Sequence, residues 1–255
     1  MLLTIDIGNT DTTFGIFDGE KLRATWHMAT GIRRMPDEYA AFLINLMRHE
    51  GLDIPDIKAI VLCSVVPPLI STFDELFQHY FHLAPLVIGA GVKTGVRIRM
   101  DNPREVGADR IVNAAAAHHL YGGPVIVADM GTATTFDTVS KEGDYMGGAI
   151  APGIMTAAEA LFTRTSMLSR VELVRPKRAI GTNTVAAMQS GIIFGYVGLI
   201  EGIVARIQKE LEEKAKVIAT GGFASLMAKE TAVFDEVNPD LTLIGLRLIY
   251  QMNKA

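Results

Sequence analysis

The chain is poor in the residues that build disulfide frameworks and thiolate metal sites. It has 255 residues but a single cysteine, Cys63, and a single tryptophan. One cysteine excludes an internal disulfide and any cysteine-rich metal site. Because Cys63 lies in the apolar run AIVLCSVV, we expect a buried, unreactive thiol and not a nucleophile.

Long apolar runs and an excess of one charge are also missing. No stretch reaches the roughly 18–20 apolar residues that cross a bilayer, and the start MLLTIDIGNT has no basic region of a signal peptide. The 24 basic and 28 acidic residues give a net charge of −4, with no basic run to follow a phosphate backbone. We therefore expect a cytoplasmic protein that binds neither membrane nor nucleic acid.

What is present is enough apolar surface for a large core. Hydrophobic residues make up 49% of the chain and charged residues 20%, a balance typical of globular α/β proteins. Apolar periodicity predicts three strands joined by short turns, followed by alternating helices and strands. The predicted strands are 2–7, 12–17, 21–28, 58–66 and 85–88, and the helices are 36–50 and 68–81.

The pattern at the start of the chain returns near residue 125. Asp6-Ile7-Gly8-Asn9-Thr10 ends the first strand, and Asp129-Met130-Gly131-Thr132 ends a predicted strand over 125–128. Each turn leads into a threonine-rich strand. We interpret the repeat as an internal duplication that gives two related α/β domains, residues 1–121 and 122–255.

The repeated turns have the composition of a phosphate clamp. Gly8 and Gly131 lack the Cβ that would keep backbone amides away from phosphate oxygens, and the neighbouring hydroxyl and amide groups are uncharged donors. The carboxylates of Asp6 and Asp129 would repel a polyphosphate unless a cation lay between them, so the pattern predicts a metal ion. Two ordinary β-turns are the alternative.

Other nucleotide-binding patterns are weak or absent. The sequence has no G-x-x-x-x-G-K-[ST] motif, and the glycines of residues 89–95 precede an alternating, strand-like segment instead of a helix. Gly221-Gly222, between a predicted strand over 216–220 and a helix over 223–229, could approach a nucleotide but is a common turn in α/β proteins.

A candidate for proton transfer lies in the segment EVGADR, residues 105–110. A helix predicted over 101–119 places Glu105 and Asp109 four residues apart on one face, where like charges destabilise. Gly107 weakens the same turn, and several broken local rules are typical of a functional site. A surface carboxylate pair neutralised by the two neighbouring arginines is the alternative.

A long helix predicted over 183–214 carries glycines on one face. Gly191, Gly195, Gly198 and Gly202 follow helical spacing, and each costs roughly 0.8–1 kcal/mol relative to alanine. Close packing against another element or another subunit would compensate.

Four motifs together resemble a known family. DIGNT at 6–10, GADR at 107–110, DMGT at 129–132 and GTNT at 181–184 are similar, in order and spacing, to those of the type III pantothenate kinases of the sugar-kinase, actin and heat-shock-ATPase superfamily. The resemblance implies two ribonuclease-H-like domains with a central cleft, a homodimer, and phosphorylation of pantothenate by ATP, the first step toward coenzyme A.

The resemblance also implies roles for individual residues. The ATP phosphates and Mg²⁺ would be held by Asp6, Ile7, Gly8, Asn9, Thr10, Asp11, Thr12 and Thr13, with a phosphate contact from Thr132. Pantothenate would be bound by Met100, Gly107, Ala108, Asp109, Arg110 and, across the dimer interface, Thr184. Asp109 would be the base, Asp129 would hold K⁺ or NH₄⁺, and Met100 stands where many members have an aromatic residue.

Two other functions stay open at this point. A regulatory, non-catalytic protein on the same fold is disfavoured by the presence of both Asp109 and Asp129. A kinase for a different small hydroxyl substrate is compatible with every motif.

Overall fold

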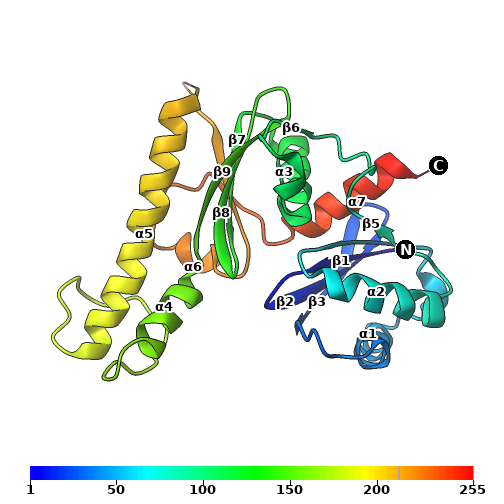
Figure 1. Cartoon of the computed structure of the whole chain (residues 1–255), viewed down its shortest axis with the longest axis horizontal. Helices are drawn as coiled ribbons and strands as arrows, with labels where there is room; N and C mark the ends of the chain where they lie inside the picture. Colours follow the sequence, from blue (N-terminus) through cyan, green and yellow to red (C-terminus); the bar gives the residue numbers. More distant parts are fainter. Residues whose placement is uncertain (212, 255) are drawn as a thin grey trace. The chain divides into compact units, whose positions relative to one another are not determined.

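Two compact units, each built on one sheet, make up the protein (Figure 1). The computed structural model describes residues 1–211 and 213–254. Unit 1 contains Met1–Val96, Asp101–Ala116 and the chain from Asp240 onward, and unit 2 contains Arg97–Met100 and Ala117–Pro239.

Unit 1 has five strands in the order β3-β2-β1-β4-β5. They are β1 (Leu2–Ile7), β2 (Asp11–Asp18), β3 (Lys21–Ala29), β4 (Ala59–Ser64) and β5 (Leu86–Val87). The first three are antiparallel neighbours, and β4 pairs parallel to β1. All five correspond to strands that apolar periodicity predicted.

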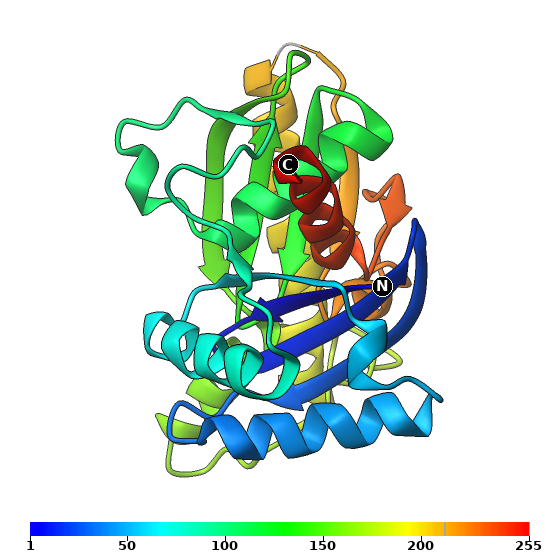
Figure 2. The same ribbon diagram turned by 90° about the vertical axis from the view of Figure 1, so that its right-hand side faces the viewer.

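Strand periodicity sends alternate side chains of unit 1 to opposite faces of its sheet. Odd-numbered residues of β1 pack against α1 (Pro36–His49) and α2 (Pro67–Leu76). The opposite face packs against α3 (Ala108–Tyr121) and α7 (Leu241–Asn253), and Figure 2 shows α7 across the sheet from α1 and α2. Asp6 and Cys63 belong to this second face by their register, opposite each other in β1 and β4.

Unit 2 has six strands in the order β11-β10-β7-β8-β9-β6. They are β6 (Arg97–Ile98), β7 (Val125–Met130), β8 (Ala133–Val139), β9 (Asp144–Pro152), β10 (Lys216–Thr220) and β11 (Glu236–Val237). The unit also contains helices α4 (Ile154–Thr163), α5 (Thr184–Leu211) and α6 (Ala224–Met227), and buried residues of all three pack on one face of the sheet.

The predicted duplication is visible in the strand order. Strands β9-β8-β7-β10-β11 repeat the order β3-β2-β1-β4-β5, with the same antiparallel and parallel pairings around β1 and β7. Asp6 and Asp129 are each the fifth residue of a six-residue strand, and both strands share one burial pattern in which only that aspartate is partly exposed. The prediction of two duplicated α/β units is therefore confirmed.

The helix predicted over 101–119 is wrong at its start. Pro103–Glu105 forms a single 3₁₀ turn capped by the Asn102 side chain, Val106 is extended, and α3 begins only at Ala108. Val106 is buried, so packing of its side chain outweighs continuation of the helix. The cap signals in the sequence belong to the short turn. Phe77–Phe81, predicted as the last turn of an α-helix, is a π-helix.

The last helix packs in unit 1, whereas the predicted boundary after residue 121 grouped it with the second domain. The chain returns to unit 1 at Asp240, and α7 buries Leu243, Leu246 and Ile249 against the same face as Val61 and Cys63. No local sequence signal specifies which sheet a later helix will cover, so periodicity could not place it.

Helix α5 is the one helix among the described residues that is long and apolar enough to cross a membrane. This finding rests on length and composition alone, and the buried core helices of other proteins are often as long and as apolar. A third of its most apolar window (33%) is buried in this chain. Its buried residues pack on the sheet of unit 2, as expected of a core helix.

Candidate functional site

Three acidic or thiol side chains meet at the carboxyl end of β1 in unit 1. Cys63 donates a hydrogen bond from Sγ to Asp6 Oδ1 at 3.2 Å, and Asp109 lies near enough to act on Asp6 electrostatically. Burial and the Asp109 carboxylate raise the pKa of Asp6 to about 7, although the hydrogen bond from Cys63 opposes the shift. Two carboxylates held this close favour a cation between or beside them.

Cys63 is buried, as its apolar surroundings predict. Burial, and then the charges of Asp6 and Asp109, raise the pKa of its thiol well above the usual value, so it remains protonated and donates to Asp6. Periodicity could place Cys63 opposite Asp6 only once the parallel pairing of β1 and β4 was known.

The first turn of α3 fixes the position of Asp109. Its Oδ1 accepts a hydrogen bond from the Arg110 backbone N–H at 2.8 Å. A Cβ on Gly107 would lie 2.4 Å from the same Oδ1, so glycine leaves the space that the carboxylate fills. Glu105 lies before the helix, where it accepts a hydrogen bond from Asn102, and the expected stacking of Glu105 on Asp109 along one helix face does not occur.

If Asp109 is the base that the family resemblance implies, Gly107→Ala is expected to lower the kcat for phosphorylation of pantothenate at least tenfold. The added methyl group displaces the carboxylate of Asp109. The change in melting temperature should be small, since the atom displaced is at the end of a side chain. Gly89→Ala is a matched control, because no described heavy atom lies within 4 Å of the Cβ position there. Steady-state kinetics and thermal unfolding measure both. Unchanged kcat in Gly107→Ala would contradict this role of the glycine.

The predicted phosphate turn of unit 1 connects β1 to β2. The Gly8 N–H donates to Asp11 O at 3.0 Å, and a Cβ on Gly8 would lie 2.9 Å from that oxygen. Asn9 and Thr10 are exposed, whereas Ile7 and Thr12 are buried. The Thr13 hydroxyl is 3.1 Å from His27 Nδ1. Exposed groups that could meet a ligand thus occupy the middle of the turn.

The corresponding part of unit 2 surrounds Asp129. Gly221 has φ +87°, and a Cβ there would lie 2.5 Å from Asp129 Oδ1 and 2.7 Å from the Met130 nitrogen. The Gly221-Gly222 turn, which by sequence alone was weak evidence for a nucleotide site, therefore fits closely against Asp129. Gly131 is less constrained within its unit, since the nearest atom to its Cβ position is 3.7 Å away.

Thr132 and Thr184 lie at two exposed places in unit 2. The Thr132 carbonyl accepts hydrogen bonds from Gly153 N and Thr156 Oγ1, which join this turn to the start of α4. Thr184 is the first residue of α5, directly after Asn183, whose side chain caps the helix by accepting from Ala186 N. Met100 is half-buried, with its sulfur 2.8 Å from the Cβ position of Gly147.

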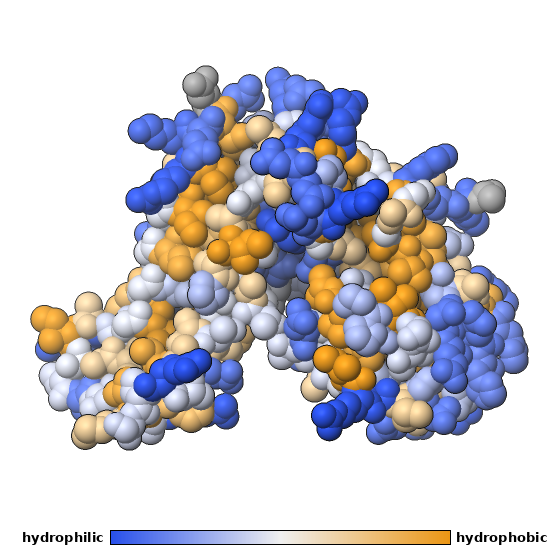
Figure 3. Space-filling view, viewed as in Figure 1, coloured by the Kyte–Doolittle hydropathy of each residue, from blue (hydrophilic) through white to orange (hydrophobic). Residues whose placement is uncertain are grey.

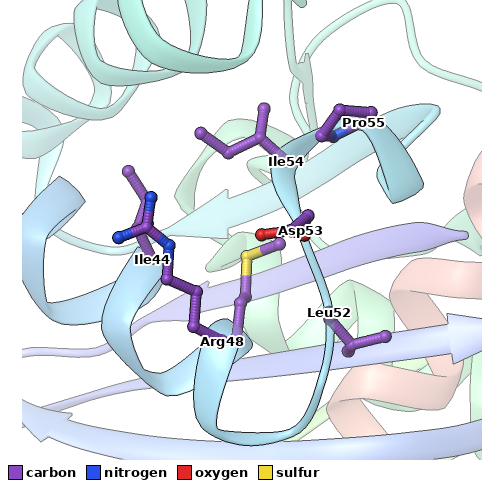
Figure 4. A pocket seen from close by; sticks show the side chains of 7 residues that line it. Ile44, Arg48, Leu52, Asp53, Ile54 and Pro55 are labelled. Carbon is purple, nitrogen blue, oxygen red and sulfur yellow. The ribbon is translucent and has the colours of Figure 1, made fainter.

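Two hollows are lined by residues other than the predicted site residues. One, about 250 Å³ in volume, is at the end of α1 and is lined by the residues of Figure 4: Ile44, Met47, Arg48, Leu52, Asp53, Ile54 and Pro55. The other, about 430 Å³, lies between β9 and the last part of α5, in a region where Figure 3 shows apolar side chains. Neither lining contains a predicted site residue.

Comparison with known proteins identifies the family. The sequence model of the type III pantothenate kinases matches residues 2–206. The chain belongs to this family. A type III pantothenate kinase of Dehalococcoides mccartyi is 59% identical over 254 residues, which cover 100% of this chain and 98% of the relative. One of Moorella thermoacetica is 54% identical, with coverage of 99% and 100%.

Solved structures of other proteins share the fold of this pantothenate kinase family member. A Baf-family protein of Campylobacter jejuni has a TM-score of 0.63 at 20% identity and covers 98% of each chain. Component A of the (R)-2-hydroxyglutaryl-CoA dehydratase of Acidaminococcus fermentans has a TM-score of 0.58 at 12% identity and covers 99% of each chain. Likenesses at these identities show the fold alone.

Proposed function

We propose that this protein transfers the γ-phosphoryl group of ATP to the primary hydroxyl of pantothenate, giving ADP and 4′-phosphopantothenate, the first step of coenzyme A synthesis. The observation that carries the proposal is the placement of Asp109 beside Asp6 in unit 1 of a chain that belongs to the type III pantothenate kinases. Phosphoryl transfer depends on positioning and charge neutralisation, which these carboxylates and turns can supply.

Asp109 accepts the proton of the attacking hydroxyl as the new O–P bond forms and the bond to the ADP oxygen breaks. Its Oδ1 is fixed by the Arg110 amide, so the carboxylate is oriented before substrate binds. Gly107, Ala108 and Arg110 line the pantothenate site in this proposal, with the Arg110 guanidinium as a partner for an anionic group and Met100 as an apolar wall.

The donor set of unit 1 fits a Mg²⁺ ion that arrives with ATP. The described residues contain no group of three or more His, Cys, Asp or Glu side chains that could hold a metal, and Mg²⁺ commonly uses one or two carboxylates plus phosphate oxygens and water. Bound there, Mg²⁺ neutralises phosphate charge. Asp6 would hold the ion, whose positive charge would favour the ionised carboxylate that burial and Asp109 disfavour. Thr132 would contact a phosphate oxygen.

A coupled ADP-release assay with ATP, Mg²⁺ and K⁺, with and without pantothenate, tests the proposal. Pantothenate-dependent ADP release is the expected result. ADP release with another small alcohol but not with pantothenate would indicate a different acceptor. No release despite calorimetric binding of ATP would favour a regulatory protein on this fold.

Asp129 is the proposed ligand of a monovalent cation. It is a partly exposed oxygen donor at the end of β7, next to the Gly221 turn. We expect K⁺ or NH₄⁺ to support higher activity than Na⁺, and Asp129→Asn to abolish that preference. Initial rates in chloride salts of equal ionic strength measure the effect. Equal rates in all three salts with the wild-type protein would contradict the assignment.

The glycine face of α5 supports a homodimer. Outside the backbone of α5 itself, no described heavy atom lies within 4 Å of the Cβ positions of Gly191, Gly195 and Gly198. The Arg206 guanidinium lies 3.2 Å from that of Gly202, so this chain alone leaves most of the glycine face uncovered. Met167 and Ile180, in the segment before α5, are 90% and 84% exposed. Close helix packing by a second copy would use the glycines and cover the apolar side chains. In this proposal Thr184, at the start of the same helix, reaches the substrate of the partner.

Gly195→Arg is expected to convert the dimer to a folded monomer. The open space at residue 195 accommodates the side chain in a single chain, whereas a closely packed second copy would clash with it. Light scattering after size exclusion measures the mass, and Gly89→Arg on unit 1 is the control. A Gly195→Arg protein that remains dimeric would exclude this face as the interface.

The other proposed properties follow from composition. A net charge of −4 without a basic run supports the absence of a nucleic-acid partner, and one buried thiol suits the reducing cytoplasm. We also propose that the protein does not associate with membranes.

A further inference from the structure

Thr30, directly after β3, makes three hydrogen bonds to the turn that connects β1 and β2 and to the start of β2. Its backbone N–H donates to Thr10 O at 2.7 Å, and its Oγ1 donates to Gly8 O at 2.8 Å. The same Oγ1 lies 2.9 Å from the Thr12 hydroxyl. One residue from outside the turn therefore contacts its first residue, its last residue and the strand that follows it. Thr30 lies in none of the motifs, so sequence analysis did not single it out.

The directions of these bonds follow from the number of protons. A threonine hydroxyl has one proton to donate, and that of Thr30 goes to Gly8 O. The contact between the two hydroxyls must then be donated by Thr12 to Thr30. The buried Thr12 hydroxyl and the Gly8 carbonyl are thus both satisfied by the single oxygen of Thr30.

The segment that carries Thr30 is itself fixed to the core. The next residue, Gly31, donates its N–H to the Tyr39 hydroxyl at 3.0 Å, and the hydroxyl donates to Gly31 O at 3.2 Å. Tyr39 is fully buried, with its ring centroid 4.7 Å from that of Phe73. Thr30 is therefore held on a rigid support.

Fixing the Gly8 carbonyl also directs the next amide. In a trans peptide the C=O and the following N–H point in opposite directions. Because Gly8 O points toward Thr30, the Asn9 N–H is directed away from Thr30, at an exposed residue in the middle of the turn. A backbone N–H oriented in this way is a phosphate donor that needs no rearrangement.

We propose that Thr30 is a positioning residue that orients the Gly8–Asn9 peptide toward the phosphates of the nucleotide. The inference rests on the proposed function for the identity of the ligand and adds a residue outside every recognised motif. Thr30 acts through the turn and does not touch the substrate.

The test compares Thr30→Val, which keeps the shape and loses the hydroxyl, with Thr30→Ser, which keeps the hydroxyl. Thr30→Val is expected to raise the KM for ATP and the Kd for ADP roughly tenfold, equivalent to about 1.4 kcal/mol. The KM for pantothenate stays unchanged, and Thr30→Ser restores values close to wild type. Thr25→Val makes the same change on β3 away from the turn and is expected to leave nucleotide affinity unchanged.

Hydrogen exchange of the peptide spanning residues 1–13 supplies a readout that is independent of turnover. Faster exchange of the turn amides in ligand-free Thr30→Val, and not in Thr25→Val, supports the proposal. Unchanged exchange together with unchanged ADP affinity overturns it, as does an equal rise in both KM values. If Thr30→Val unfolds, Thr30→Ala with the same measurements decides. A wild-type protein that binds ADP but does not phosphorylate pantothenate refutes the proposed substrate, while the binding and exchange data still decide the role of Thr30.

Discussion

Asp109→Asn is expected to lower kcat about 10²–10⁴-fold, the usual range for loss of a positioned general base. The asparagine side chain keeps the shape, and its carbonyl oxygen can still accept from the Arg110 N–H, so the first turn of α3 should persist. What is lost is the ability to take the proton of the acceptor hydroxyl. Calorimetric affinity for ADP should remain close to wild type, because the nucleotide turn is formed by other residues.

Glu105→Gln is the matched control for this variant. It makes the same chemical change four residues earlier, at an exposed side chain that lies before the helix. We expect kcat close to wild type. Near-normal turnover in Asp109→Asn would remove Asp109 as the base. Since Asp109 is one cause of the raised pKa of Asp6, that pKa should also fall in the variant.

Gly245→Ala is expected to lower the stability of unit 1 substantially. A Cβ at residue 245 of α7 would lie 2.4 Å from Val112 O and 3.0 Å from Val112 C, both backbone atoms of α3. Neither helix can relieve the contact by a side-chain rotation, so the two must separate. Overpacking of this kind costs about 1–3 kcal/mol, and each kcal/mol lowers the melting temperature of a chain this long by roughly 2–4 °C.

Thermal unfolding of Gly245→Ala beside Gly89→Ala measures this effect. The Gly89 variant should unfold like the wild type, because its Cβ would meet no described atom within 4 Å. A melting temperature for Gly245→Ala equal to that of the control would show that α3 and α7 do not pack as closely as described.

Sequence periodicity predicted the strands well because each of them alternates or is uniformly apolar between turn residues. The duplication was also visible, since Asp6 and Asp129 end equivalent strands and are followed by glycine turns. These features are local, and a local pattern determines them.

Contacts between distant segments were not predictable from pattern. The hydrogen bond from Cys63 to Asp6 depends on the pairing of β1 with β4, and the role of Thr30 depends on the path of the chain after β3. The predicted start of the helix that contains α3 was wrong for a related reason. Burial of Val106 decided where the helix begins, whereas the cap residues indicated an earlier start.

The return of α7 to unit 1 affects how the protein forms on the ribosome. Strands β1 to β5 are synthesised first and α3 can then cover part of the face that carries Asp6 and Cys63, but the part that packs on α7 stays exposed until the residues after 239 have been made. During that interval all of unit 2 is translated, and uncovered apolar surface favours misassembly and aggregation. Nascent chains arrested before residue 240 should therefore bind chaperones and be degraded by proteases more readily than complete chains.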